Sequence, residues 1–264
     1  MKIKIKFLFL SIIILQTTII CNGQPANQNW VLIPESSDEF NGTAVDTMKW
    51  NPKPGYSTSR AFYFRFENVA VQGGFLRLTA KKEDFKGKSY TSAYLESKFD
   101  DPGNGSYVEV RARSIDVRAN VCCAIWEQTF PLKPSLDPNP EIDIQEFLLS
   151  GFNGNPNRVQ STLHRWWRTG NKHLQDTYQV YDAKDPLCYD YHIYALERRD
   201  GKLRFYLDGF KYWEVDMTFA PEYVTMPRHM IFSLEGHAGN PVDFFLPGVF
   251  MIDYIRTYKF AGQK

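Results

Sequence analysis

The sequence is poor in cysteine and has no apolar run long enough to cross a bilayer. Only 4 of its 264 residues are Cys, and their spacing matches no zinc site. The apolar segment at residues 7–15 is too short for a transmembrane helix. The motifs G-x-S-x-G and H-E-x-x-H are also absent. Nothing in the sequence therefore supports a serine hydrolase or a zinc hydrolase.

The chain also lacks a strong excess of charge of either sign. Its formal net charge is +1, and removal of residues 1–23, which hold three Lys and no acid, changes this to −2. Such a near-neutral balance argues against a nucleic-acid-binding protein. Internal repeats, low-complexity tracts and long stretches of helical periodicity are missing as well, so neither a repeat protein nor a helical bundle is expected.

The N-terminus has the features of an export signal. Three Lys precede the short apolar segment, and Cys21 and Gly23 are small residues at the spacing of a cleavage site. We therefore expect residues 1–23 to be a signal peptide and the protein to be secreted or periplasmic. A lipid anchor on Cys21 is the alternative, but Ile20 stands where such anchors usually have a small residue.

The remaining sequence predicts a leader at residues 24–36 and one β-rich domain at residues 37–260. Aromatic residues make up 16% of the chain, and aromatic side chains fit pleated surfaces. Short strand candidates follow one another between turn residues, without alternating helices, which predicts an all-β sandwich or barrel. The candidates are residues 69–80 (a hairpin), 94–99, 107–115, 191–215 (a three-strand meander), 230–234 and 249–258.

Three Cys lie beyond the signal segment. Cys122 and Cys123 are adjacent, so on a strand they point to opposite faces, and one of them is able to pair with Cys188. Three buried thiols that act as small hydrophobic side chains are the alternative.

The segment Glu141-Ile-Asp-Ile-Gln-Glu carries the strongest functional signal. Side chains alternate along a strand, so Glu141 and Asp143 share one face and the isoleucines share the other. Glu146 lies five residues after Glu141 and would fall on the wrong face. A β-bulge near Gln145 would insert one residue and return Glu146 to the side of the other acids, as bulges beside active sites do.

Three acids on one strand face fit the chemistry of glycoside hydrolysis. A retaining hydrolase needs two carboxyl groups about 5–5.5 Å apart, one to attack the anomeric carbon and one to protonate the leaving oxygen. An acid between them raises the proton affinity of the general acid through like-charge repulsion. The residue types alone leave two other interpretations open, an exposed edge strand with solvated charges and a calcium site.

The segment 141–146 resembles the E-x-D-x-x-E signature of glycoside hydrolase family 16 in its bulged form. Other parts of the sequence resemble the same family in the expected order. Residues 37–42 and 46–50 are similar to its opening segment, residues 106–113 to a cleft strand, and residues 252–258 to its final strand. The resemblance therefore covers nearly the whole chain beyond the signal.

This resemblance implies a jelly-roll β-sandwich of the concanavalin-A-like type with a long concave cleft. It implies Glu141 as the nucleophile, Glu146 as the acid/base and Asp143 as the assisting carboxylate. Glu109 and Arg111 are expected at the floor of the cleft. No cofactor is expected for catalysis.

The resemblance also implies a structural calcium ion on the convex side of the sandwich. The matching positions are Glu39, a backbone carbonyl near Gly74, and Asp253. We treat these residues as a tentative ligand set.

Within the family, the sequence is most similar to the β-agarase and β-porphyranase branch. The substrate-binding candidates are Arg60, Trp126, His164, Trp166 and Glu235. His164 and Trp166 share one strand face, so both are able to contact sugars near the cut, although one Trp of the Trp166-Trp167 pair is expected to pack.

Porphyran differs from agarose in carrying sulfate, which a fixed guanidinium binds well. We therefore expect a secreted, retaining endo-hydrolase that cuts β-1,4 linkages in porphyran. A β-agarase is the first alternative, followed by a carrageenase and a β-glucanase. The arginines near the expected cleft elements are Arg60, Arg111, Arg113, Arg165 and Arg168.

Two functions of other kinds fit the same fold. A non-catalytic carbohydrate-binding protein would keep the aromatic side chains but would not need all three acids. A transglycosylase would use the same residues as a hydrolase, because the two differ only in whether water or a sugar hydroxyl takes over the glycosyl group. For each of these functions the binding partner is a polysaccharide. We expect the protein to be a monomer.

Overall fold

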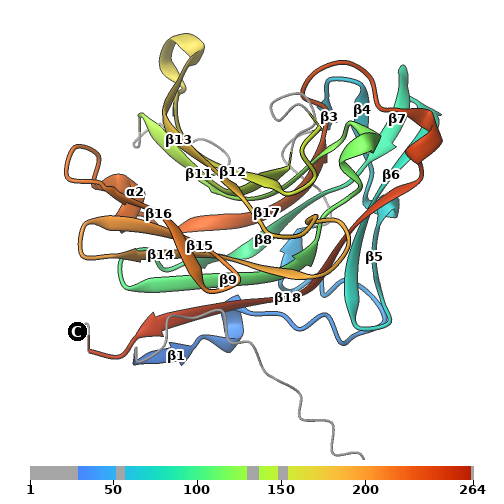
Figure 1. Ribbon diagram of the computed structural model, residues 1–264. Coiled ribbons are helices and arrows are strands. Elements are labelled where there is room, and N and C mark those ends of the chain that lie inside the picture. Colours follow the sequence, from blue (N-terminus) through green and yellow to red (C-terminus); the bar gives the residue numbers. More distant parts are fainter. Residues whose placement is uncertain (1–28, 52–56, 130–136, 148–153, 263–264) are drawn as a thin grey trace, which may run out of the picture.

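The computed structural model describes residues 29–51, 57–129, 137–147 and 154–262, and it forms two stacked, largely antiparallel β-sheets (Figure 1). This is the predicted jelly-roll sandwich. The predicted signal peptide and the lipid anchor at Cys21 lie outside the described residues. No helix among those residues is long and apolar enough to span a membrane.

The outer sheet contains, in spatial order, β16 (Phe210–Asp216), β15 (Lys202–Leu207), β14 (His192–Arg199), β9 (Ser106–Arg113), β18 (Gly248–Phe260), β6 (Phe75–Phe85), β7 (Lys88–Ser92), β4 (Phe62–Phe64) and β3 (Thr58–Ser59). Two further strands, β1 (Trp30–Leu32) and β5 (Val69–Gln72), pair with β18 and β6.

The inner sheet contains β13 (Lys172–Asp182), β12 (Arg158–Trp167), β11 (Asn139–Phe147), β10 (Cys122–Gln128), β17 (Arg228–Glu235), β8 (Tyr94–Asp101) and β2 (Trp50–Asn51). Figure 1 shows this sheet curving over the outer one, so that its far face is concave. Helical structure within the described residues is limited to α2 (Glu222–Thr225) and the short 3₁₀ turns η1 (Pro34–Ser36), η2 (Phe66–Asn68), η3 (Val117–Ala119), η5 (Thr169–Asn171) and η6 (Asp243–Phe245).

The turns that connect the strands follow from local residue choice. The β5–β6 hairpin turns at Gly73 and Gly74, where φ is 65° and 81°. The meander β14–β15–β16 turns at Asp-Gly pairs whose four residues also have positive φ. Two-residue turns of this kind need positive φ, which Gly adopts without strain and Asp tolerates. These predicted strands are confirmed.

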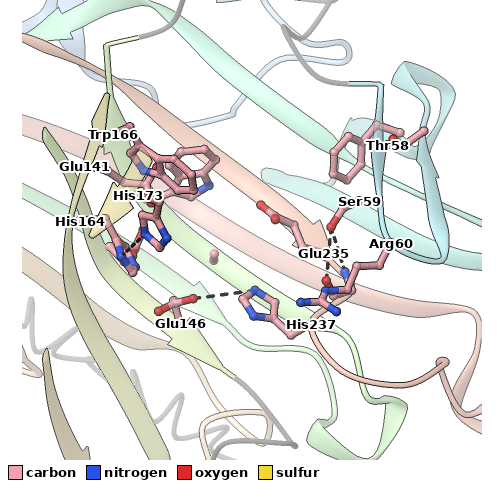
Figure 2. Close-up of a pocket in the computed structure, with 15 residues that line it drawn as sticks. Thr58, Ser59, Arg60, Glu141, Glu146, His164, Trp166, His173, Glu235 and His237 are labelled. Carbon is pink, nitrogen blue, oxygen red and sulfur yellow. Dashed lines mark hydrogen bonds and ion pairs between the residues drawn. The ribbon is translucent and has the colours of Figure 1, made fainter. Parts of the chain in front are cut away.

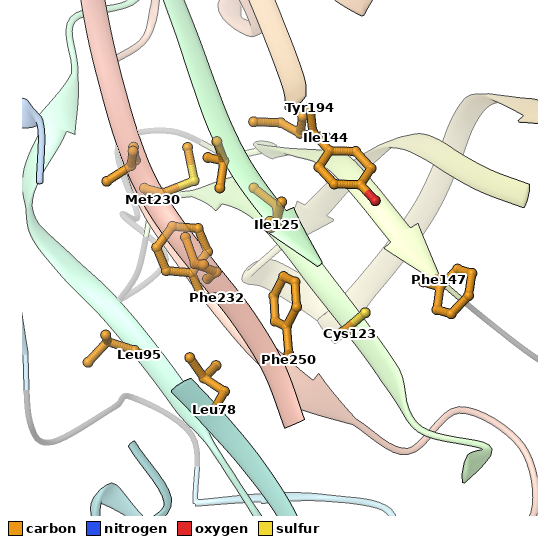
Figure 3. Close-up of a cluster of buried hydrophobic side chains, with 14 of the residues drawn as sticks. Leu78, Leu95, Cys123, Ile125, Ile144, Phe147, Tyr194, Met230, Phe232 and Phe250 are labelled. Atoms are coloured by element: carbon orange, nitrogen blue, oxygen red, sulfur yellow. The ribbon is translucent and has the colours of Figure 1, made fainter. Parts of the chain in front are cut away.

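The two sheets enclose a core of aliphatic and aromatic side chains (Figure 3). Leu78 and Phe250 enter it from the outer sheet, and Ile125, Ile144 and Phe232 enter it from the inner sheet; each is at most 1% exposed. The isoleucines of β11 therefore face this core, as the alternation in the sequence predicts. Burial of this apolar surface is the main term that stabilises the sandwich.

The N-terminal part and the cysteines also have defined places. β1 and η1 lie within the segment predicted as a leader, and β1 pairs with the end of β18. Cys122, Cys123 and Cys188 are all free thiols. Cys123 packs in the core between the sheets, whereas Cys122 belongs to a cluster on the other face of the inner sheet. The thiols are free, but only Cys122 and Cys123 are buried as predicted, because Cys188 is partly exposed.

Four buried charged residues connect the two sheets near α2. Arg198 comes from the outer sheet, and Asp101, Glu127 and Arg228 come from the inner sheet; all are at most 2% exposed. Arg198 Nη2 lies 2.6 Å from Asp101 Oδ1 and 3.7 Å from Glu127 Oε2. Burial opposes ionisation of Asp101, but Arg198 and hydrogen bonds outweigh it and lower the Asp101 pKa. Burial raises the pKa of Glu127 well above its usual range. Asp101 is therefore the charged partner of Arg198.

Arg228 anchors the start of β11 in the inner sheet. Its guanidinium donates to the Tyr223 carbonyl at 2.8 Å and to the Pro140 carbonyl at 3.3 Å. Pro140 directly precedes Glu141 in β11. Burial and the neighbouring Arg198 lower the Arg228 pKa to about 9. The start of β11 is thus held by a buried cation.

We predict that Asp101→Asn destabilises the protein by about 3–5 kcal/mol, because it leaves the Arg198 charge buried without its partner. Urea unfolding at neutral pH measures this. Asp182→Asn is the matched control, since it breaks the exposed pair with Arg158, and exposed pairs contribute little. Equal losses in the two variants would contradict the role of the buried pair.

Candidate active site

A β-bulge in β11 brings the three acids of the sequence motif to one face. Trp126 of β10 pairs with Asp143, and the next residue, Ile125, pairs with Gln145, so β11 carries one extra residue at this point. The β12 side shows the same shift between Asp143 and Glu146. Glu146 therefore returns to the concave face. The bulge predicted from the spacing of the acids is confirmed.

Glu141, Asp143 and Glu146 line a single pocket of about 470 Å³ on the concave face. Their exposed fractions are only 8%, 6% and 8%. Figure 2 shows Trp166, His173 and His164 on one side of this pocket, and Ser59, Arg60 and His237 on the other. The three carboxylates thus lie in a sheltered cleft between two walls of different chemistry.

Glu141 and Asp143 are held by donors from the neighbouring strands. Gln128 Nε2 donates to Glu141 Oε2 at 2.5 Å. His164 Nε2 lies 3.2 Å from Asp143 Oδ2. Gln128 of β10 is the direct register partner of Glu141. His164 of β12 also pairs with Glu141 in register, and its side chain reaches diagonally to Asp143.

Glu146 has a different set of partners. Thr162 Oγ1 donates to Glu146 Oε2 at 2.8 Å, and His237 Nε2 lies 3.9 Å from Glu146 Oε1. Glu235, at the end of β17, accepts a hydrogen bond of 2.6 Å from Ser233. Glu146 therefore lies beside an imidazole and a hydroxyl.

Burial and repulsion from neighbouring carboxylates make Glu141 and Asp143 hard to ionise. Burial raises the Glu141 pKa well above its usual range, with a further contribution from Asp143, while His164 and Trp166 oppose the rise. Burial also raises the Asp143 pKa well above its usual range, and the charges of Glu146 and Glu235 add to this. Perturbed carboxyl groups that converge in a cleft are typical of catalytic sites.

Several other predicted residues line the same pocket. Arg60, Trp126, His164, Trp166 and Glu235 all contribute to its walls. Trp126 is 7% exposed, and its indole N–H donates to Ser233 at 3.0 Å, so it both packs and faces the cleft. Residues that the sequence analysis did not select are Thr58, Ser59, Phe64, Ala124, His173, Gly236 and His237.

The prediction that Glu109 and Arg111 form the cleft floor is wrong. Both lie on β9, which is a central strand of the outer sheet. Glu109 is fully buried and accepts a hydrogen bond from Tyr258, and Arg111 pairs with Asp253 at 2.5 Å. Arg113 shares this face of β9. The concave face belongs to the other sheet, so none of these side chains reaches it.

Two further arginines also lie outside the pocket. Arg165 Nε is 2.6 Å from Asp176 Oδ2, so the Asp176 carboxylate neutralises the Arg165 charge. Arg168 is exposed just beyond β12, where its backbone N–H donates to Asp137. Among the described residues, Arg60 is the one arginine that lines the pocket. The expected concentration of arginines in the cleft is therefore not present there.

The structure does not support the tentative calcium ligands. Glu39 receives hydrogen bonds of 2.7 and 2.9 Å from Arg256, and Asp253 is paired with Arg111. Both carboxylates are thus engaged by guanidinium groups. A calcium ion prefers several free oxygen ligands, and the two acids predicted to bind beside Gly74 do not offer them here.

Two groups of side chains inside the cleft have donor atoms close enough to reach one metal ion, with separations within 4.8 Å. Each group includes one or more of the three motif acids, which catalysis would require to be free. The groups are Cys122, Glu146 and His237, and Glu141, Asp143 and His164.

His173 and His237 are the most informative residues that the sequence analysis missed. His173 lies on β13, an exposed edge strand whose polar sequence gives little strand signal. His237 follows the predicted strand that ends near Glu235, and a Glu-x-His spacing at a strand end was a usable signal. Their positions depend on which strands become neighbours.

Comparisons with known proteins match the chain over nearly its whole length. The family model described as "Beta-porphyranase A-D, GH16 domain" matches residues 30–260. The chain is 29% identical to a β-glucanase of Rhodothermus marinus, over 88% of this chain and 86% of that protein. It is 27% identical to β-porphyranase C of Zobellia galactanivorans, over 70% of this chain and 64% of that protein.

A longer relative and one solved structure complete the comparison. The clotting factor G α subunit of Tachypleus tridentatus is 29% identical over 93% of this chain, which spans only 36% of that protein. The structure of β-agarase A from Zobellia galactanivorans superposes with a TM-score of 0.76 at 21% identity, and the match covers 94% of this chain and 98% of that one. At this identity the structural match shows a shared fold.

We predict that Asp143→Asn raises the free energy of unfolding at pH 7. The folded-state pKa of Asp143 lies above its unfolded value, so the folded protein binds more protons between the two values and loses stability as pH rises through them. Each unit of separation corresponds to about 1.4 kcal/mol.

The gain is expected to shrink as pH falls toward about 3.9, the unfolded Asp value. Urea unfolding of both proteins between pH 7 and pH 4 tests this, with Asp185→Asn on the exposed surface as control. A variant that is less stable than the parent at pH 7 would show that ionised Asp143 does not destabilise the folded protein.

Proposed function

Since the chain belongs to the family of β-porphyranase A–D domains in glycoside hydrolase family 16, we propose that it is a retaining endo-hydrolase of a β-1,4-linked galactan. The observation that carries this proposal is the bulged strand β11, which gathers three buried carboxylates along one side of a cleft. Acids with only a structural role would stay exposed to water, because burying carboxylates is costly. Their burial together in a cleft therefore indicates a function.

The mechanism assigns a separate task to each acid. Glu141 attacks the anomeric carbon while Glu146 gives its proton to the departing glycosidic oxygen, and the bond between that carbon and that oxygen breaks. Glu146 then takes a proton from water, whose oxygen attacks the same carbon and releases Glu141. Two inversions at one carbon retain the β configuration.

The surroundings of the acids suit these tasks. The nucleophile has to be anionic although burial opposes its ionisation, and Gln128 stabilises the anion by donating to Glu141 at 2.5 Å. Asp143 lies between the two glutamates in sequence and holds a proton readily because its pKa is raised. Glu146 lines the same cleft, with His237 Nε2 3.9 Å from its Oε1.

Trp166 and Trp126 supply aromatic surface next to the acids. Flat rings of this kind stack on the apolar faces of sugars, which positions the anomeric carbon over the nucleophile. Such positioning accounts for a large part of the rate of an enzyme.

We propose a sulfated galactan of the porphyran type as the substrate. The match to the β-porphyranase domain family supports this choice, as does Arg60. Arg60 is exposed at the rim of the pocket, and no ion pair joins it to a carboxylate among the described residues. A free guanidinium at a cleft rim is suited to a sulfate group. Neutral agarose, carrageenan and β-glucan remain the alternatives that the experiment below distinguishes.

We also propose that the protein acts outside the cytoplasm. The basic and apolar N-terminal segment, residues 1–23, supports export. Polymeric galactans would meet the enzyme there.

Glu141→Gln and Glu146→Gln are each expected to abolish turnover, because they remove the nucleophile and the acid/base without a large change of shape. Release of reducing ends from porphyran measures activity, and thermal unfolding checks the fold. Glu67→Gln, at an exposed glutamate outside the cleft, serves as control. Substantial activity in either cleft variant would contradict the assignment of these roles.

Arg60→Met is expected to lower kcat/KM on porphyran about 10- to 100-fold, the effect of losing a charge-assisted hydrogen bond. The same variant should change cleavage of desulfated porphyran little. Arg168→Met, at an arginine outside the pocket, is the matched control.

The substrate panel for this test contains porphyran, desulfated porphyran, agarose, κ-carrageenan, laminarin and mixed-linkage glucan. If Arg60→Met lost activity equally on sulfated and desulfated porphyran, Arg60 would not bind the sulfate group. Cleavage of agarose alone would make the protein an agarase and leave the mechanism unchanged.

A further inference from the structure

One imidazole of the cleft, that of His173, contacts two other groups at once. His173 lies on β13 opposite Trp166 of β12. Its ring stacks on the Trp166 indole with centroids 3.9 Å apart and an angle of 15° between the planes. His173 Nε2 is also 2.9 Å from His164 Nδ1. A single side chain on an edge strand therefore touches both the aromatic wall and the histidine beside the acids (Figure 2).

These contacts form a chain that ends at the catalytic acids. His164 uses Nδ1 toward His173 and Nε2 toward Asp143 Oδ2, which is 3.2 Å away. A neutral imidazole has one N–H donor and one acceptor nitrogen. When Asp143 is ionised, His164 must present Nε2–H to it, so His164 Nδ1 must accept from His173 Nε2–H.

His173 is suited to this donor role. Burial and the neighbouring His164 lower its pKa, which keeps the ring neutral near pH 7 and gives it one defined N–H. The stacking contact with Trp166 restricts rotation of the His173 ring. The rotamer that satisfies the stack therefore also aims Nε2 at His164.

We propose that His173 is a positioning residue that fixes the Nε2–H tautomer of His164 toward Asp143 and holds Trp166 in place as a sugar platform. This inference rests on the proposed glycosidase function for its kinetic part only. His173 acts through its two neighbours, so its two contacts should affect different kinetic constants. The hydrogen bond should act on kcat through the acids, and the stack should act on KM through the platform.

A matched pair of variants separates the two contacts. His173→Phe keeps an aromatic ring against Trp166 but cannot donate to His164. His173→Gln places an amide N–H near the position of Nε2 but loses the stack. Gln179→Ala is the control on the same strand, because its amide contacts only the Val180 carbonyl among the described residues.

His173→Phe is expected to lower kcat about five- to tenfold, the effect of one hydrogen bond, with KM nearly unchanged. His173→Gln is expected to raise KM several-fold and to keep most of kcat. Gln179→Ala should match the parent in both constants. If the two His173 variants lose kcat and KM in the same proportion, the division of roles is wrong.

The tautomer itself is measurable without any substrate. Nitrogen-15 NMR of the His164 ring in the parent protein, at a pH high enough to ionise Asp143, should show the proton on Nε2, and His173→Phe should shift the population toward the Nδ1–H form. A proton on Nδ1 in the parent would overturn the inference. If no galactan is cleaved, this spectrum still decides the inference, so failure of the proposed function and failure of this inference are distinguishable.

Discussion

The extra residue in β11 is the constraint on which the whole cleft depends. Without it, Glu146 would point between the sheets, and only Glu141 and Asp143 would share the concave face. With it, the isoleucines of β11 still reach the core, so one strand supplies both the packing and the chemistry. The bulge is stable because β10 and β12 hold β11 from both sides, and their ladders adapt at the same point.

The molecule contains two kinds of buried charge with opposite consequences. Near α2, Arg198 and Asp101 neutralise each other across the two sheets. In the cleft, no arginine of the described residues pairs with the three motif acids, and the contacts that stabilise these acids there come from neutral donors and imidazoles. The first arrangement fixes the end of the sandwich. The second leaves Glu141 and Asp143 with raised pKa values, which is useful for catalysis and unfavourable for folding.

Local patterns in the sequence were enough to predict most of the strands and the shared face of the three acids. Alternation, Gly turns and the spacing of Glu141 and Glu146 are properties of one strand and its turns, so they are readable without a structure. The prediction that β9 contributes to the cleft was wrong. Alternation shows which residues share a face of a strand, but it does not show which sheet the strand joins. Glu109 and Arg111 were therefore placed in the wrong sheet. His173 was missed because an exposed polar edge strand lacks the apolar alternation that signals burial.

The acids and the arginine proposed to contact sulfate occupy different parts of the fold. The acids stand on β11 in the middle of the inner sheet, whereas Arg60 follows β3 at the margin of the outer sheet, where β4 pairs with β7. The two strands at this margin, β3 and β4, are only two and three residues long. Substitutions and insertions there can accumulate without disturbing the bulge. Such a division of labour makes the domain evolvable, since a lineage can acquire new polymers by remodelling the margin while it inherits the reaction unchanged.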